Sequence, residues 1–297
     1  MIQRFHLPYS IAIVGPVVVM GLTSCAKPPA ASRHVAQIQF QPIEQWKSPW
    51  PASSFSEIVP APGQICCTPY SINDSGDIVG QSSVITSETV TTHGFILQRG
   101  SYKTVDFPKA NKETTLVNID NEGTITGYYR DTKDIDHWFH VRGNKFKEIQ
   151  FPYRHLHPPG RLSITAPFHT TSRNADGIIV GTYSVPLPDA VYDRHFGFKF
   201  LHGKYFTIHG PTGANDVGAN GINNKGEIVG DFFDSKHCGH GYVLTHGKYQ
   251  EFDDPNVVLD GHTIGTFALG INNRGAIVGV YEDGVGMYHG FLLNRPT

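Results

Sequence analysis

The sequence predicts an all-β fold, a five-bladed β-propeller built from repeats of about fifty residues. One phrase, Ile-Asn-x-x-Gly-x-Ile-Val-Gly or a close variant, occurs five times. Its first glycines are Gly76, Gly123, Gly177, Gly226 and Gly275, spaced 47, 54, 49 and 49 residues apart. The segments around the phrase are β-branched and aromatic, and no stretch has a convincing 3.6-residue apolar period. With 17% charged residues, 32 Gly and 20 Pro, the composition argues against a coiled helix or a disordered chain. Four-stranded repeats of this length are typical of propellers.

Residues 1–24 are predicted to be a signal peptide. Arg4 precedes an apolar run that ends at Leu22 and is interrupted by Gly15 and Pro16. At about a dozen residues, such a run is too short and too broken for a membrane span, and it suits the apolar region of a secretory signal.

The end of that run, Leu22-Thr23-Ser24-Cys25, resembles the lipobox of bacterial lipoproteins. The resemblance implies cleavage before Cys25, lipidation of its thiol and a stable membrane anchor of several acyl chains. Because Ala26 follows instead of Asp, the resemblance also implies a place at the outer membrane of the bacterial cell envelope. The alternative is an ordinary signal peptide with a chance cysteine.

Residues 25–34 are polar and Pro-rich and are expected to tether the lipid to a single folded domain over 35–297. Export makes disulfides chemically accessible to the remaining cysteines, Cys66, Cys67 and Cys238. Their odd number leaves at least one thiol over, and which of them pair stays open.

Each repeat has the same order of parts. The Asn-x-x-Gly segment supplies the side-chain hydrogen bonds and the left-handed residue of a tight turn, and a strand follows. A second strand opens with a histidine, and an Arg-Gly or His-Gly turn leads to a last strand ending near proline. A residue present in every repeat is first a scaffold residue. The expected scaffold residues are His93, His137, His195, His240 and His289, with Asn73, Asn174, Asn223 and Asn272 in the turns.

The repeat resembles the HAF-type extracellular repeat family, whose unit reads Gly-Ile-Asn-x-x-Gly-x-Ile-Val-Gly and then His-x-Phe. The resemblance covers roughly residues 60–295 and implies export and a repetitive β architecture. Two positions depart from the pattern: Arg173 replaces the Ile, and Phe196 stands between His195 and Gly197.

The fifth repeat ends at Leu292-Leu293-Asn294 without an outer strand, which would leave an exposed sheet edge. The segment Phe55–Pro60 is expected to supply that strand beside Gly290–Leu293 and so to close a ring of five blades. A competing donor is Gln37–Pro42. The alternative architecture is a solenoid of stacked hairpins, because repeats alone do not distinguish a ring from a rod.

The longest repeat contains a distinctive loop, residues 153–161, with His155, His157 and Arg161 as candidate ligand-binding residues. In an extended segment both histidines lie on one face, where they could reach a metal ion. A solvated basic loop explains them as well, because no further ligand is placed near them.

The segment His237-Cys238-Gly239-His240 is a second possible metal group, since thiolate and imidazole suit zinc or copper. His240 already has a scaffold explanation, and a cysteine of an exported protein is commonly disulfide-bonded or buried. No metal or other cofactor is therefore predicted.

Aromatic and polar residues that occur in only one repeat are the remaining ligand candidates. Trp138 stands where the other repeats have glycine, and Phe168, His169 and Asp216 fall on or near the segments before the Asn turns. So do Glu113 and His262. These segments would be the innermost strands, so these residues could line the central channel, although core packing explains most of them equally well.

The sequence favours a binding or interaction module. Net charge is −2 without a long basic run, which leaves nucleic-acid binding without a visible source. No nucleophile elbow, zinc-protease motif, phosphate loop or dinucleotide fingerprint occurs. The leading hypothesis is a monomeric envelope lipoprotein that recognises a carbohydrate or a protein partner. The alternatives are a glycan-acting hydrolase with carboxylates at the channel and a purely structural envelope protein.

Overall fold

The computed structural model describes residues 48–86, 89–111, 113–152, 155–163, 171–186, 193–257 and 265–296. The chain divides into two compact parts, Met1–Gln45 and Trp46–Thr297, and all described residues belong to the second. Within them every regular element is a β-strand except the 3₁₀ turn η1, Ala52–Ser54. Among the described residues there is no helix long and apolar enough to cross a membrane.

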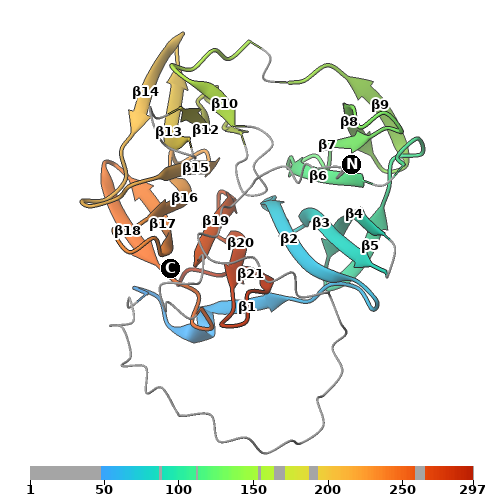
Figure 1. Ribbon diagram of the computed structural model, residues 1–297, viewed down its shortest axis with the longest axis horizontal. Helices are drawn as coiled ribbons and strands as arrows, with labels where there is room; N and C mark the ends of the chain where they lie inside the picture. The colour runs from blue at the N-terminus through green and yellow to red at the C-terminus, as the bar shows by residue number, and fades with distance from the viewer. Residues whose placement is uncertain are drawn as a thin grey trace, which may run out of the picture. The chain divides into compact units, whose positions relative to one another are not determined.

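The strands group by repeat into five units, which follow one another along the chain in Figure 1. Unit one contains β2 (Ile65–Ile72), β3 (Ile78–Ile85), β4 (Val90–Gln98) and β5 (Ser101–Val105). Unit two contains β6 (Glu113–Ile119), β7 (Ile125–Arg130), β8 (Asp136–Arg142) and β9 (Lys145–Ile149). Unit three contains β10 (Arg161–Ser163), β11 (Ser172–Arg173), β12 (Ile179–Val185), β13 (Arg194–Leu201) and β14 (Lys204–Ile208). Unit four contains β15 (Val217–Ile222), β16 (Ile228–Phe233), β17 (Gly239–Thr245) and β18 (Lys248–Phe252). Unit five contains β19 (Thr266–Ile271), β20 (Ile277–Glu282) and β21 (Tyr288–Leu293), joined by β1 (Phe55–Ile58).

Within each unit the strands form an antiparallel meander, and the fold is the predicted all-β propeller of four-stranded sheets. Units one and two share one eight-stranded sheet through a single parallel pair, Thr92 with Glu113. Unit three differs, because both β10 and β11 pair with β12. Arg161 therefore begins a strand instead of lying in a loop. That five units complete the ring stays a prediction from the repeat count.

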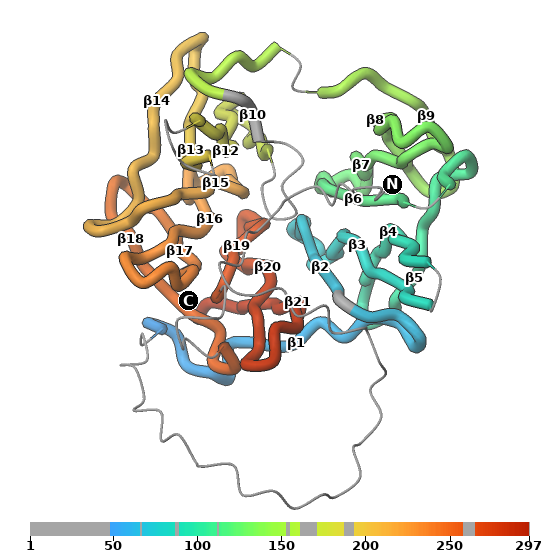
Figure 2. Tube along the Cα trace, in the orientation of Figure 1, coloured from blue at the N-terminus to red at the C-terminus, as the bar shows by residue number. Residues whose placement is uncertain are grey.

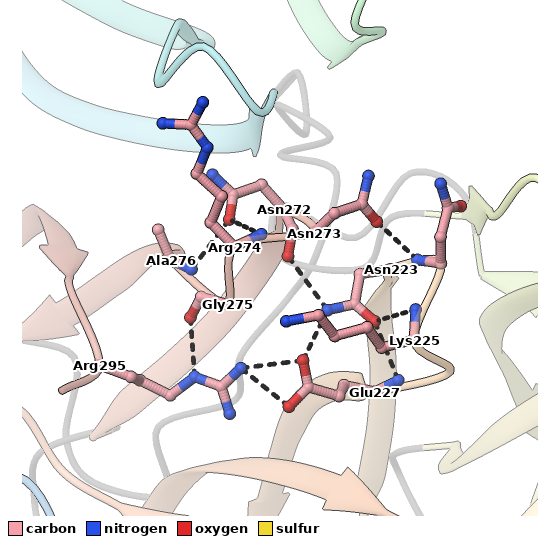
Figure 3. A network of polar contacts seen from close by, with 10 residues as sticks. Asn223, Lys225, Glu227, Asn272, Asn273, Arg274, Gly275, Ala276 and Arg295 are labelled. Carbon is pink, nitrogen blue, oxygen red and sulfur yellow. Dashed lines mark hydrogen bonds and ion pairs between the residues drawn. The ribbon is translucent and has the colours of Figure 1, made fainter. Parts of the chain in front are cut away.

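The two turn types form as the residues predict. In unit four, Asn223 Oδ1 accepts the backbone N–H groups of Lys225 and Glu227, and Gly226 has φ 77°. Asn272 makes the same two bonds in unit five, as Figure 3 shows. Between the last two strands of units one, three and four, both central residues have positive φ, as in His246-Gly247 at 50° and 79°. This is the backbone of a type I′ hairpin, which matches the twist of the strands.

The strand that closes the last unit comes from the other end of the chain. β1 pairs antiparallel with β21, with Phe55 opposite Leu293 and Ile58 opposite Gly290. Figure 2 shows these first and last described strands side by side. The prediction for Phe55–Pro60 is confirmed, and the competing segment Gln37–Pro42 lies outside the described residues.

Two rows of hydrogen bonds join neighbouring units at their Asn turns. In the first row an asparagine Nδ2 donates to the carbonyl oxygen of the corresponding residue of the next unit: Asn73 to Asp120, Asn174 to Asn223, Asn223 to Asn272 and Asn272 to Asn73. In the second row a backbone N–H donates to the next unit's side chain: Asp74 to Asn121, Ala175 to Asn224, Asn224 to Asn273 and Asn273 to Asp74. The bonds from unit five to unit one suit a ring and not an open stack of hairpins.

The five repeated histidines are scaffold residues, as predicted. Each lies within 4 Å of a carboxylate: His93 of Asp106, His137 of Asp131, His195 of Asp216, His240 of Asp253, and His289 of both Glu57 and Asp283. Asp131 also accepts the backbone N–H groups of Lys133 and Ile135, so His137 holds the hairpin loop that this aspartate organises. The bond from His137 and these backbone bonds lower the pKa of Asp131 to about 2.

Candidate functional site

Residues of all five units line a pocket of about 380 Å³ at one mouth of the central channel. Its rim is made of the Asn turns, from Asn73 in unit one to Asn273 in unit five. Most polar groups of this rim are engaged in the two rows of bonds between units. We call it the channel-mouth pocket.

Two carboxylates of the channel mouth, those of Asp74 and Asp120, accept hydrogen bonds within the fold. Asp74 accepts bonds from the backbone and side-chain N–H groups of Asn273 and from the side chain of Asn121, all at 2.8 Å. Burial raises the pKa of Asp74, but these bonds outweigh it and the net shift is downward. Asp120 accepts the backbone N–H of Thr124 at 2.7 Å. A carboxylate whose pKa is lowered by hydrogen bonds is a poor general acid, so Asp74 is not suited to that role in glycan hydrolysis.

A second pocket, of about 470 Å³, lies on unit two and is lined by Tyr128, Asp136, His137, Trp138, Ile149, Gln150 and Phe151. We call it the Trp138 pocket. It is built from the ends of β7, β8 and β9 and from the two residues that follow β9.

Trp138 is decisive for this pocket because glycine fills the same position in the other units. A Cβ atom on Gly94 would lie 2.8 Å from Leu116 of unit two, and one on Gly290 would lie 2.9 Å from the Cys67 carbonyl of unit one. A Cβ on Gly197 would lie 3.1 Å from Ala219 of unit four. The glycines therefore allow the next unit to pack closely, and an indole has no room in such an interface.

The indole of Trp138 joins a row of three aromatic rings. Its centroid lies 5.4 Å from that of Tyr128, which is directly opposite on β7, and 5.1 Å from that of Phe151. The ring planes are inclined at 48° and 54°. Such a half-buried wall offers apolar faces to a ligand at little conformational cost.

A charged cluster borders the aromatic row. The Arg130 guanidinium lies 2.8 Å from Glu113 and 2.9 Å from Asp136, which occupy neighbouring strands opposite it. Tyr128 donates its hydroxyl to Glu113 at 3.2 Å. Burial raises the pKa of Glu113 despite the opposing effect of Arg130. Two carboxylates against one guanidinium give this cluster a net negative formal charge.

The other candidate residues lie apart from this pocket. His155 and His157 are exposed on either side of buried Leu156, and the backbone N–H of His157 donates to the Tyr205 hydroxyl. Asp216 accepts the backbone N–H of His195 at 2.7 Å, so it joins unit four to unit three. Arg161 pairs through its backbone with Ser184. Cys25, Phe168, His169 and His262 lie outside the described residues.

The residues of the segment His237–His240 have structural roles in the fold. His237 has φ 64° in the hairpin turn before β17, Cys238 is buried, and His240 is bonded to Asp253 at 3.0 Å. Across the residues that the structure describes, no group of three or more His, Cys, Asp or Glu side chains is placed to hold a metal ion.

Sequence reasoning identified Trp138 but missed Tyr128, Asp136 and Phe151. A signal for Tyr128 was present, because the residue after the second glycine of each phrase lies opposite the glycine or tryptophan of the His phrase. Phe151 offered no such signal, since its contact with Trp138 arises where the chain leaves β9.

No family model and no curated protein matches this chain. Among solved structures, a fucose-recognising lectin of Aleuria aurantia with a six-bladed β-propeller fold is 11% identical, with 76% of this chain and 74% of that chain covered and a TM-score of 0.37. A hypothetical protein from Leishmania major is 10% identical, with 79% and 87% covered and a TM-score of 0.41. A GH130 protein is 8% identical, with 79% and 86% covered and a TM-score of 0.40. These likenesses carry no argument about what this chain binds.

Proposed function

We propose that this protein is a carbohydrate-binding module and that the Trp138 pocket is its binding site. The observation that carries the proposal is the row of three half-buried aromatic rings beside hydrogen-bonding side chains in one pocket. Sugar rings have an apolar C–H face, which packs on aromatic rings, and hydroxyl groups, which need polar partners. Asp136 and Gln150 offer such partners on the pocket wall.

The charge of the site narrows the ligand class. Glu113 and Asp136 share one guanidinium, so an additional anion beside them meets net repulsion. A neutral or amine-bearing glycan fits this potential, and an amine could in addition lie against an aromatic face. The proposed ligand is thus a neutral or amino sugar polymer and not an acidic one.

Replacement of Trp138 by alanine is expected to weaken binding at least tenfold, whereas W138F should lose less affinity. The measurement is isothermal titration calorimetry with three soluble hexasaccharides: chitohexaose, the fully deacetylated chitosan hexamer and hexagalacturonate. We expect binding of the first two and a loss of at least tenfold in affinity for the alanine variant.

The matched control is Trp50→Ala, because Trp50 is also half-buried but packs against the core formed by units four and five. The control variant should bind as the parent protein does. Equal affinity of W138A and the parent, or selective binding of hexagalacturonate, would contradict the proposed site.

We further propose that the module is held at the cell envelope by a lipid on Cys25. The support is the signal-like segment with Leu22-Thr23-Ser24-Cys25 at its end. Replacing Cys25 by serine should move the protein from the membrane fraction to the soluble fraction, which fractionation and immunoblotting would measure. Continued membrane association of C25S, with the parent as the control, would mean that another segment anchors the chain.

A further inference from the structure

The junction between units two and three differs chemically from the four junctions that the Asn-turn bonds join. In each of those four, an asparagine amide donates to a carbonyl oxygen, and a side-chain oxygen accepts a backbone N–H. Unit two has Asp120 at the donor position, and an aspartate side chain has no N–H to donate. Unit three has Ala175 at the acceptor position, and its methyl group accepts nothing. Neither bond of the pattern can therefore form at this junction.

A third departure from the repeat falls on unit two, which precedes this junction. Trp138 occupies the position at which unit one, unit three and unit five have a glycine packed against the following unit. The unit that follows unit two is unit three. Two residues, Asp120 and Ala175, thus remove the two bonds of one junction, and the Trp138 pocket lies on the unit that precedes this junction.

The pocket also reaches the chain that leads into unit three. Gln150 and Phe151 follow β9 and precede β10, and both line the pocket together with Trp138. A ligand that contacts Trp138 and Phe151 at once would restrain this connection relative to the sheet of unit two.

We propose that the junction between units two and three is the seam at which this propeller opens, and that a ligand in the Trp138 pocket closes it. The second statement rests on the proposed carbohydrate-binding function. A ligand that favours the closed seam stabilises the closed form by mass action, and a seam closed in advance binds that ligand more tightly.

The chain itself supplies the variant that tests the seam. Asp120→Asn with Ala175→Asn would restore both bonds by copying unit four, where Asn223 and Asn224 make them. The turn of unit two survives this change, because Asn73 Oδ1 accepts the N–H of Asp77 just as Asp120 accepts that of Thr124. The backbone N–H of Ala175, which donates to Asn224, is also retained.

The first measurement is the unfolding rate of the mature protein in guanidinium chloride, followed by intrinsic fluorescence. The relinked variant D120N/A175N should unfold at least fivefold more slowly than the parent. The matched control is Asn224→Ala, which removes one acceptor from a joined junction and should unfold faster. If the relinked variant unfolds at the rate of the parent while N224A unfolds faster, the proposal that the propeller opens between units two and three is wrong.

The second measurement adds chitohexaose at a saturating concentration. It should slow unfolding of the parent more than unfolding of the relinked variant, and its affinity should be several-fold higher for the relinked variant. If chitohexaose binds both proteins and slows both equally, ligand-coupled closing is wrong while the binding function stands. If none of the three hexasaccharides binds the parent, the proposed function is wrong, and the rates without ligand still decide the seam.

Discussion

Removal of residues 48–60 is expected to lower the melting temperature of the whole folded domain by roughly 10 °C. This deletion takes away β1, whose Ile58 is 4% exposed within the core between units one and five. It also removes Phe55, whose ring lies 6.0 Å from that of Phe291. Burial of two such side chains contributes roughly 4 kcal/mol to the free energy of unfolding. For a domain of this size, a loss of that amount lowers the melting temperature by roughly 10 °C.

The reason for a global effect is the position of β1. It pairs with the last strand of unit five and so joins the two ends of the described chain. Without it, β21 becomes an exposed edge, and separate fraying of the terminal units becomes possible. Differential scanning calorimetry of the mature protein measures both the midpoint and the sharpness of the transition.

The matched control is deletion of residues 35–47, which removes the competing segment Gln37–Pro42 and leaves β1 intact. This control should melt as the parent does. If deletion of residues 35–47 lowers the stability more than deletion of residues 48–60 does, the closing strand is Gln37–Pro42. If the protein without residues 48–60 melts as sharply and at the same temperature as the parent, the pairing of β1 with β21 does not contribute to its stability.

Replacement of Gly230 by alanine is expected to destabilise the protein by roughly 3 kcal/mol. Gly230 is the second glycine of its phrase and lies on β16 directly against the backbone of β15. A Cβ atom there would overlap the Gly218 carbonyl oxygen and lie 2.8 Å from the hydroxyl of Tyr242. Because the Gly218 carbonyl belongs to the backbone of β15, which pairs with β16, it cannot move away without disturbing the strand pairing.

Gly226→Ala is the comparison within the same turn and strand. Gly226 has nothing within 4 Å of the added atom but has φ 77°, so only the left-handed backbone opposes the methyl group. Its expected cost is about 1 kcal/mol. Urea unfolding of the two variants measures the difference. Equal costs would mean that backbone conformation alone, and not the close approach of β15, explains the second glycine.

The repeated phrase predicted the strands and the turns, and the missing outer strand of the fifth repeat reduced the closing segment to two candidates, Phe55–Pro60 and Gln37–Pro42. Asn223 and Gly226 have local roles that neighbouring residues alone explain, namely a side-chain bond to the turn and a positive φ. The need of the last sheet for an outer strand is equally independent of tertiary detail, because unpaired edges are unfavourable in any arrangement. The histidines were recognisable as scaffold through repetition, although their carboxylate partners were not.

The candidate site was accessible only in part. Trp138 was distinctive because it breaks a repeated glycine, and that much can be read along the chain. The binding wall required Phe151 and Tyr128 beside it, and the charged border required Glu113 and Asp136 on one guanidinium. These contacts join four different segments of unit two, and their meeting depends on strand register and on the path of the chain after β9.

The sequence by itself therefore determined the repeat, its β-strands and its tight turns, because these depend on local backbone preference and on periodic burial. Only the tertiary structure decided which units are joined by side-chain bonds and where a pocket opens. The physical reason is that a hydrogen bond such as that from Asn272 to Asn73 links residues 199 positions apart. Whether such a residue forms a bond to the next unit, or fails to form one as Asp120 and Ala175 do, is determined only when the neighbouring unit is in place.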